Sequence, residues 1–184
     1  MNQHDMTRNM VLAALFAALT AIGAFLQIPT GTVPITLQFL FTALAGLLLG
    51  WKWGAISQLL YVGLGLLGLP VFTQGGGIGY VLRPSFGFLL GLIPAAAVIG
   101  ALTARRTGYL TVLAAVLVGD LILYAVGVPY MYLILHVYMQ SAKTFPALLA
   151  AMLVYVPGDT LKIVVVTALA PVLRRTLVKA VPNL

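Results

Sequence analysis

Six long apolar runs, separated by short polar or charged segments, make up most of this sequence. They cover roughly residues 10–28, 35–50, 54–71, 86–103, 108–128 and 145–173. A helix needs about 20 apolar residues to cross a bilayer, and backbone polar groups in lipid must be satisfied within helices or closed barrels. The pattern predicts an all-α integral membrane protein in which residues 1–184 form a single domain of six transmembrane helices.

Two stretches of the sequence bear on the number of transmembrane helices. The first run follows Arg8, as in a secretory signal, but it is too long for one and no small-x-small cleavage site follows it. It is therefore interpreted as a retained helix. The apolar stretch at residues 130–137 is too short to span a bilayer, and we expect it to be an interfacial piece of the connection before the last helix.

Charged residues make up only 7% of the sequence, against roughly 25% in soluble domains. They lie between the apolar runs, which argues against nucleic-acid binding despite a net charge of +7, because nucleic-acid binders gather Lys and Arg on one face. On six helices with an internal N-terminus, the cytoplasmic side receives Arg8, Lys52, Arg105, Arg106, Arg174, Arg175 and Lys179. The other side receives only Arg83 and Lys143. The positive-inside rule therefore predicts a multi-pass protein of the cytoplasmic membrane with both termini in the cytoplasm.

The segment Pro157-Gly158-Asp159-Thr160-Leu161-Lys162 places an acid and a base inside the last apolar run. Ionisable side chains within a membrane are costly and usually mark a substrate or ion site. Residues three apart share a helix face, so Asp159 and Lys162 can reach one partner. Pro157 and Gly158 predict a break in the helix here, and irregular backbone at membrane depth is tolerated where it lines a cavity. We expect a pocket that opens outward; the alternative is an internal ion pair that holds helices in register.

Two connections on the outer side are candidates for closing this pocket. Residues 29–38 offer Thr36 and Gln38 as hydrogen-bonding groups without charge. Residues 71–85 are rich in glycine, and glycine permits close approach of the backbone to a ligand. Candidate binding residues in this second segment are Gly75, Gly76, Tyr80 and Arg83. A nucleotide cradle is disfavoured because no Gly-Lys-Ser/Thr follows the glycines; Tyr80 also fits an interfacial aromatic belt, and Arg83 also fits a surface charge.

Alanines recur at every fourth position of the first run, at Ala13, Ala17 and Ala21 and again at Ala14 and Ala18. Small residues at this spacing let helices approach closely in membranes. The stripes fit either packing within this chain or docking of a partner helix.

Few side chains could support catalysis. Asp120, Asp159, His136 and Ser141 are the candidates in or near the runs, but Lys162 beside Asp159 would keep that acid ionised, and no orienting acid lies close to His136 in the sequence. The sequence has no group of side chains spaced as metal ligands and no ATP-binding loop. We expect neither an enzyme nor a metal site, and we expect that the chain cannot itself use ATP.

Six motifs occur in a fixed order: Val33–Gln38, Gly65–Phe72, the glycines leading to Tyr80, Arg83–Phe88, Gly127–Tyr130 and Pro157–Lys162. Together they resemble the BioY family, the biotin-specific substrate-binding (S) components of energy-coupling factor (ECF) transporters. The resemblance implies an ECF S-component fold and capture of biotin, as substrate rather than cofactor, for uptake driven by a transmembrane (T) subunit and two ATPase subunits. Slow uptake by a homo-oligomer without these partners is an alternative, as is another small vitamin as the substrate.

The resemblance also suggests residue roles. It implies that Asp159 and Lys162 contact biotin and that the alanine stripes of the first helix dock the T subunit. This chain departs from the family in having Arg83 where a small residue is common and Phe88 where many members have Tyr. Asp120, a second acid within the runs, could partner Lys162 or Arg83.

Overall fold

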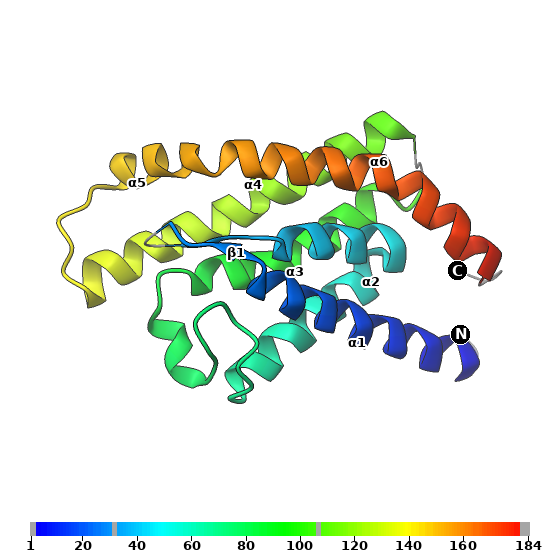
Figure 1. Cartoon of the computed structure of the whole chain (residues 1–184), viewed down its shortest axis with the longest axis horizontal. Helices are drawn as coiled ribbons and strands as arrows, with labels where there is room; N and C mark the ends of the chain where they lie inside the picture. The colour runs from blue at the N-terminus through cyan, green and yellow to red at the C-terminus, as the bar shows by residue number, and fades with distance from the viewer. Residues whose placement is uncertain (1–2, 31–32, 106–107, 181–184) are drawn as a thin grey trace.

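The computed structural model describes residues 3–30, 33–105 and 108–180 and consists almost entirely of helices (Figure 1). The α-helices are α1 (Gln3–Phe25), α2 (Gln38–Leu66), α3 (Phe86–Leu102), α4 (Tyr109–Leu133), α5 (Phe145–Ala151) and α6 (Val156–Ala180). Shorter helical segments are η1 (Ile78–Leu82), η2 (Ile134–Tyr138) and η3 (Met152–Val154). The strands β1 (Gln27–Ile28) and β2 (Ile35–Thr36) pair antiparallel, a small addition to the all-helical prediction.

Helix α2 covers most of two predicted runs, 35–50 and 54–71, as two halves that fold back on each other. The chain reverses at Gly50, whose φ of +76° is easily reached only by glycine. Beyond the turn the two halves are in contact at Gly46 and Gly54. Their backbones lie so close that a Cβ on Gly54 would come within 2.9 Å of the Cα of Gly46. Thr42 of the first half donates a 2.9 Å hydrogen bond to Gln58 of the second. Buried polar bonds of this kind hold helices together where lipid offers no hydrophobic driving force.

The prediction that residues 130–137 form an interfacial connection is wrong. Helix α4 continues through Leu133, and the π-helix η2 extends it to Tyr138. The extension is stabilised by packing that the sequence does not reveal, because Val128, Met131 and Leu135 form a second apolar cluster with Leu148 and Tyr155.

The break in the last run lies slightly earlier than Pro157 and Gly158. Helix α5 passes through the 3₁₀ segment η3, and α6 then starts at Val156. Pro157 therefore lies in the first turn of α6, where its missing N–H has no intrahelical acceptor to lose. The proline starts a helix at this point, and the preceding residues make the bend.

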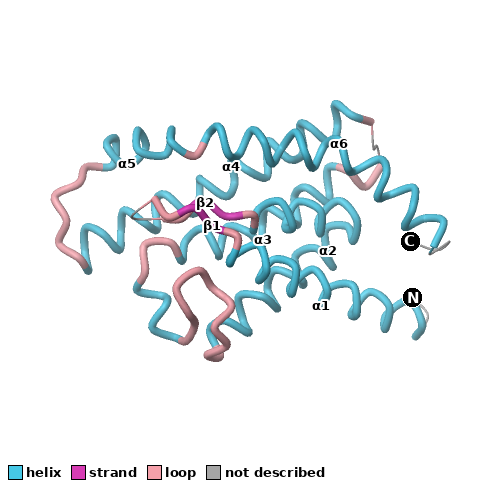
Figure 2. Tube along the Cα trace, viewed as in Figure 1, coloured by secondary structure: helices cyan, strands magenta, loops and turns pink. Residues whose placement is uncertain are grey.

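The helices are arranged so that the two described ends of the chain lie together (Figure 1). Helix α2 packs on α1 and α3, α3 on α4, and α6 on α4 and α2. Most of the long connections gather at the opposite end (Figure 2). Within the described residues, four helices are long and apolar enough to cross a membrane, namely α1, α2, α4 with η2, and α6; α3 is apolar but shorter.

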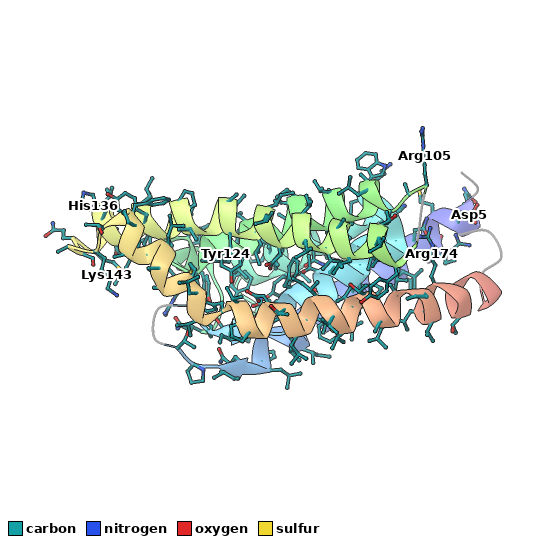
Figure 3. All side chains as sticks on the ribbon, turned by 90° about the horizontal axis from the view of Figure 1, so that it is seen from above. Asp5, Arg105, Tyr124, His136, Lys143 and Arg174 are labelled. Carbon is teal, nitrogen blue, oxygen red and sulfur yellow. The ribbon has the colours of Figure 1, made fainter. Side chains whose placement is uncertain are left out.

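Basic residues divide between the two ends of the bundle. Arg105 and Arg174 lie at the end that holds Asp5, whereas Lys143 and His136 lie at the other (Figure 3). Lys52 belongs to the first end, because Gly100 packs against the turn at Gly50 and Trp51. Arg106 lies outside the described residues, and the side chains of Arg175 and Lys179 are not described.

The two alanine stripes of α1 face in different directions. Ala13 and Ala17 are only 2% and 3% exposed and belong to this chain's own core, which removes them as contacts for a partner. Ala14 and Ala18 are exposed. The docking prediction therefore narrows to Ala14 and Ala18.

The different burial of the two stripes predicts that the same substitution lowers the stability of the protein at Ala17 but not at Ala18. Ala17→Leu should overpack the core and lower the free energy of unfolding by about 1–3 kcal/mol. Ala18→Leu should leave it unchanged within about 0.5 kcal/mol, because exposed positions tolerate substitution. Thermal unfolding of both purified variants in one detergent measures the difference; equal destabilisation would contradict the assignment of the two faces.

Candidate functional site

A pocket of about 620 Å³, its open mouth included, lies where the first and second connections meet α2, α3, α4 and the start of α6. Most of its wall is apolar, from residues such as Phe39, Phe88 and Leu123. Its polar lining residues are Thr36, Gln38, Thr73, Tyr80, Ser85, Tyr124, Tyr155, Asp159 and Lys162. An apolar cavity with a few convergent polar groups is the usual form of a small-molecule site.

Asp159 and Lys162 form a buried ion pair in this pocket. The two residues are 6% and 7% exposed, and the Lys162 Nζ donates a 2.6 Å hydrogen bond to Asp159 Oδ1. Asp159 lies in the first turn of α6, where the helix dipole favours a negative charge. Its other oxygen, Oδ2, accepts a hydrogen bond from the Tyr124 hydroxyl of α4. The prediction that the two side chains share one face of a helix is confirmed by this geometry, whereas their role in binding stays a prediction.

Thr36 and Gln38 enter the pocket from the first connection and the start of α2. Thr36 Oγ1 donates to Gln38 Oε1 at 2.9 Å, and Gln38 Nε2 donates to the Tyr61 hydroxyl at 2.8 Å. Tyr61 in turn donates to the carbonyl of Val71. This chain of hydrogen bonds fixes the Gln38 amide and ties the first connection to the second.

The second connection contributes Tyr80 but not the other three predicted residues. Tyr80 is 3% exposed, and its hydroxyl lies 2.9 Å from Thr73 Oγ1. Gly75 pairs with Phe72 in a tight turn, and Gly76 packs so closely on the carbonyl of Leu69 that a Cβ there would come within 2.1 Å. These glycines shape the loop and, among the described residues, do not line the pocket.

Arg83 also lies outside the pocket lining. Its side chain is exposed, donates a hydrogen bond to Gln74 and lies over the Tyr80 ring, with its Cζ 5.5 Å from the ring centroid. Arg83 thus supports Tyr80 from the outer side of the loop.

Two tyrosines of the site are not evident from the sequence. Tyr124 joins α4 to Asp159, and Phe88 packs on it edge to face at 5.9 Å. Tyr155 donates to the carbonyl of Val33 and lies 2.9 Å from Thr30 Oγ1, which fastens the first connection to the start of α6. One feature of the sequence could have indicated them. Tyr124 lies four residues after Asp120 and Tyr155 four residues before Asp159, so each tyrosine shares a helix face with an acid.

Two of the candidate catalytic residues, His136 and Ser141, do not join Asp159 in the pocket. His136 of η2 stacks on Tyr132 of α4, and Ser141 Oγ accepts a hydrogen bond from the Lys143 N–H. Within the described part of the chain, both lie outside the pocket lining, and no group of three metal-ligating side chains is present. The site offers an acceptor, an ammonium donor, an amide and hydroxyls on apolar walls, which suits binding rather than bond cleavage.

Comparison with known proteins identifies related chains that match this one over most of their length. A family model described as BioY family matches residues 1–179. A probable biotin transporter BioY from Lysinibacillus sphaericus is 51% identical over 147 residues, or 79% of this chain and 75% of that protein. The biotin transporter BioY of Thermotoga maritima is 36% identical over 164 residues, or 89% of this chain and 94% of that protein.

A solved structure has the same fold as this chain. The S-component for biotin from an ECF-type ABC transporter, a crystal structure at 2.1 Å, matches with a TM-score of 0.83 and 30% identity, over 95% of each chain. Since the family model spans nearly the whole sequence and the fold agrees throughout, the chain belongs to the BioY family.

Proposed function

We propose that this multi-pass membrane protein is the biotin-binding subunit of an ECF-type biotin uptake transporter. The observation that carries the proposal is the buried Asp159–Lys162 pair, which faces an apolar pocket in a chain whose relatives are biotin transporters. Those relatives and the solved S-component are transport proteins, so the enzyme alternative loses its support.

Biotin matches the chemistry of the pocket. Its ureido ring carries two N–H donors and one carbonyl acceptor, and its valerate chain ends in a carboxylate. The Asp159 carboxylate accepts N–H groups, whereas the Lys162 ammonium donates to oxygen. The aromatic walls formed by Phe88 and Tyr124 suit the apolar thioether ring and methylene chain that lie between these polar ends.

The orientation in the membrane follows from charge. Six crossings result when the two halves of α2 are counted separately with α1, α3, α4 and α6. The end with Arg105, Arg174 and Lys52 then faces the cytoplasm, together with both termini, in accord with the positive-inside rule. Met152 and Tyr155 line this pocket and also a second cavity, which Lys143 lines as well. The pocket therefore lies toward the end of the bundle that holds Lys143, which supports an opening toward the outer side.

Energy for uptake must come from other subunits. The sequence has no phosphate-binding loop of the Gly-Lys-Ser/Thr type, so the chain by itself has no recognised means of using ATP. A T subunit and two ATPase subunits would supply this function, and the exposed Ala14 and Ala18 form the face on which a T-subunit helix could pack closely.

The first prediction for this function concerns the ion pair. The wild-type protein, purified in detergent, should bind biotin, and Asp159→Asn and Lys162→Ala should each weaken binding at least about 30-fold. Removing one partner leaves the other charge buried and unpaired, which commonly costs about 2–5 kcal/mol. Calorimetric titration with biotin measures the effect, and thermal unfolding checks that both variants remain folded. Wild-type affinity in both folded variants would show that the pair is structural.

The second prediction separates partner docking from biotin binding. Ala14→Trp with Ala18→Trp should leave biotin affinity unchanged but abolish assembly with the T and ATPase subunits, because a bulky side chain keeps a docked helix away. Ala114→Trp is the matched control, since Ala114 is an exposed alanine on α4. Co-purification of the complex and ATP-dependent biotin uptake in proteoliposomes measure the result; normal assembly of the double variant would exclude this face.

A further inference from the structure

Asp120 is a half-buried acid for which neither the fold nor the proposed binding site accounts. Its Oδ1 is buried and has no hydrogen-bond partner among the residues that the structure describes. An unpaired carboxylate oxygen in an apolar bundle carries a desolvation cost without compensation. Asp120 also interacts electrostatically with both Asp159 and Lys162, which places it beside the ion pair.

The packing of α4 against α6 explains this proximity. The two helices run in opposite directions, with Arg105 before α4 and Arg174 late in α6 at the same end of the bundle (Figure 3). The hydrogen bond from Tyr124 to Asp159 joins them at one level. Asp120 lies four residues before Tyr124 on α4, and Lys162 lies three residues after Asp159 on α6. Residues three or four apart share a helix face, so both side chains lie about one turn from this hydrogen bond toward the Arg174 end.

The hydrogen bonds of Asp159 show why a second acid is useful. Each of its oxygens already accepts one hydrogen bond, Oδ1 from Lys162 and Oδ2 from Tyr124. A carboxylate oxygen can accept two hydrogen bonds, so a ligand N–H competes with Lys162 or Tyr124 where it approaches along the direction that this partner holds. The Lys162 ammonium carries three donors, so when it is displaced it needs another acceptor within reach.

We propose that Asp120 is the ligand-dependent acceptor of the Lys162 ammonium. In the empty protein Lys162 pairs with Asp159; when the ligand donates to Asp159, the ammonium turns toward Asp120 Oδ1. Lys162 thus stays neutralised in both states, and the charge of Asp159 becomes free to bind the ligand. Asp120 is a positioning residue in this scheme, and the inference rests on the proposed binding of biotin.

The test compares biotin affinity with the stability of the empty protein. Asp120→Asn should weaken biotin binding about tenfold or more, since the amide keeps the shape but loses the charge that the loaded state requires. The melting temperature of the empty variant should not fall, because the uncompensated carboxylate is removed. Asp120→Glu should bind more tightly than Asp120→Asn. Asp5→Asn, the same change at the Asp5–Arg8 pair far from the pocket, is the matched control and should bind normally.

A double-mutant cycle shows whether Asp120 acts through Lys162. In a Lys162→Met background, Asp120→Asn should cause at most a twofold further loss of affinity. An unchanged dissociation constant for Asp120→Asn in the wild-type background, or equal losses in both backgrounds, would overturn the inference while leaving biotin binding intact. Failure of the wild-type protein to bind biotin would instead overturn the proposed function.

A second measurement needs no substitution. A crystal structure of the wild-type protein with biotin should place Lys162 Nζ within about 3 Å of an Asp120 carboxylate oxygen. Bound biotin with Lys162 still on Asp159 and out of reach of Asp120 would overturn the inference even if the Asp120 variants do not fold.

Discussion

Burying an ion pair in an apolar helix bundle is the constraint on which the site depends. A charge there is tolerated only with a partner and additional hydrogen bonds. Asp159 has both, from Lys162 on its own helix and from Tyr124 on α4. The position of the acid in the first turn of α6 adds the favourable end of the helix dipole. The junction before α6 therefore determines where the charge lies and which helix must pack beside it.

The irregular segments of the chain gather around this junction. Backbone that leaves helical geometry at membrane depth must be buried by protein or line a cavity. Here the β1–β2 pair, the 3₁₀ segment η3 and the second connection meet at one pocket, and Tyr155 fastens the first of these segments to α6. The same feature thus serves folding and access to the ligand.

Much of this could be predicted from the sequence, and the exceptions have physical causes. The apolar helices and the position of Asp159 and Lys162 on one helix face could be predicted, because both depend only on residues that are close in the sequence. The extension of α4 past Leu133 could not be predicted, because it depends on packing against α5 and Tyr155. Gly75 and Gly76 were predicted to approach a ligand, but their freedom is used for a turn and for contact with Leu69. Spacing located the alanine stripes, whereas the direction of each stripe required the tertiary structure.

We infer that the ion pair serves the ligand and is not needed for the fold. Biotin binding by a triple variant without the pair tests this inference: Asp159→Leu with Lys162→Met and Tyr124→Phe, the last removing a hydroxyl that would otherwise lose its acceptor. Replacing a buried ion pair by packed apolar residues is often neutral or stabilising. The variant should therefore unfold at or above the wild-type temperature and bind no biotin in calorimetry. Binding at wild-type affinity would contradict the account, as would failure to fold.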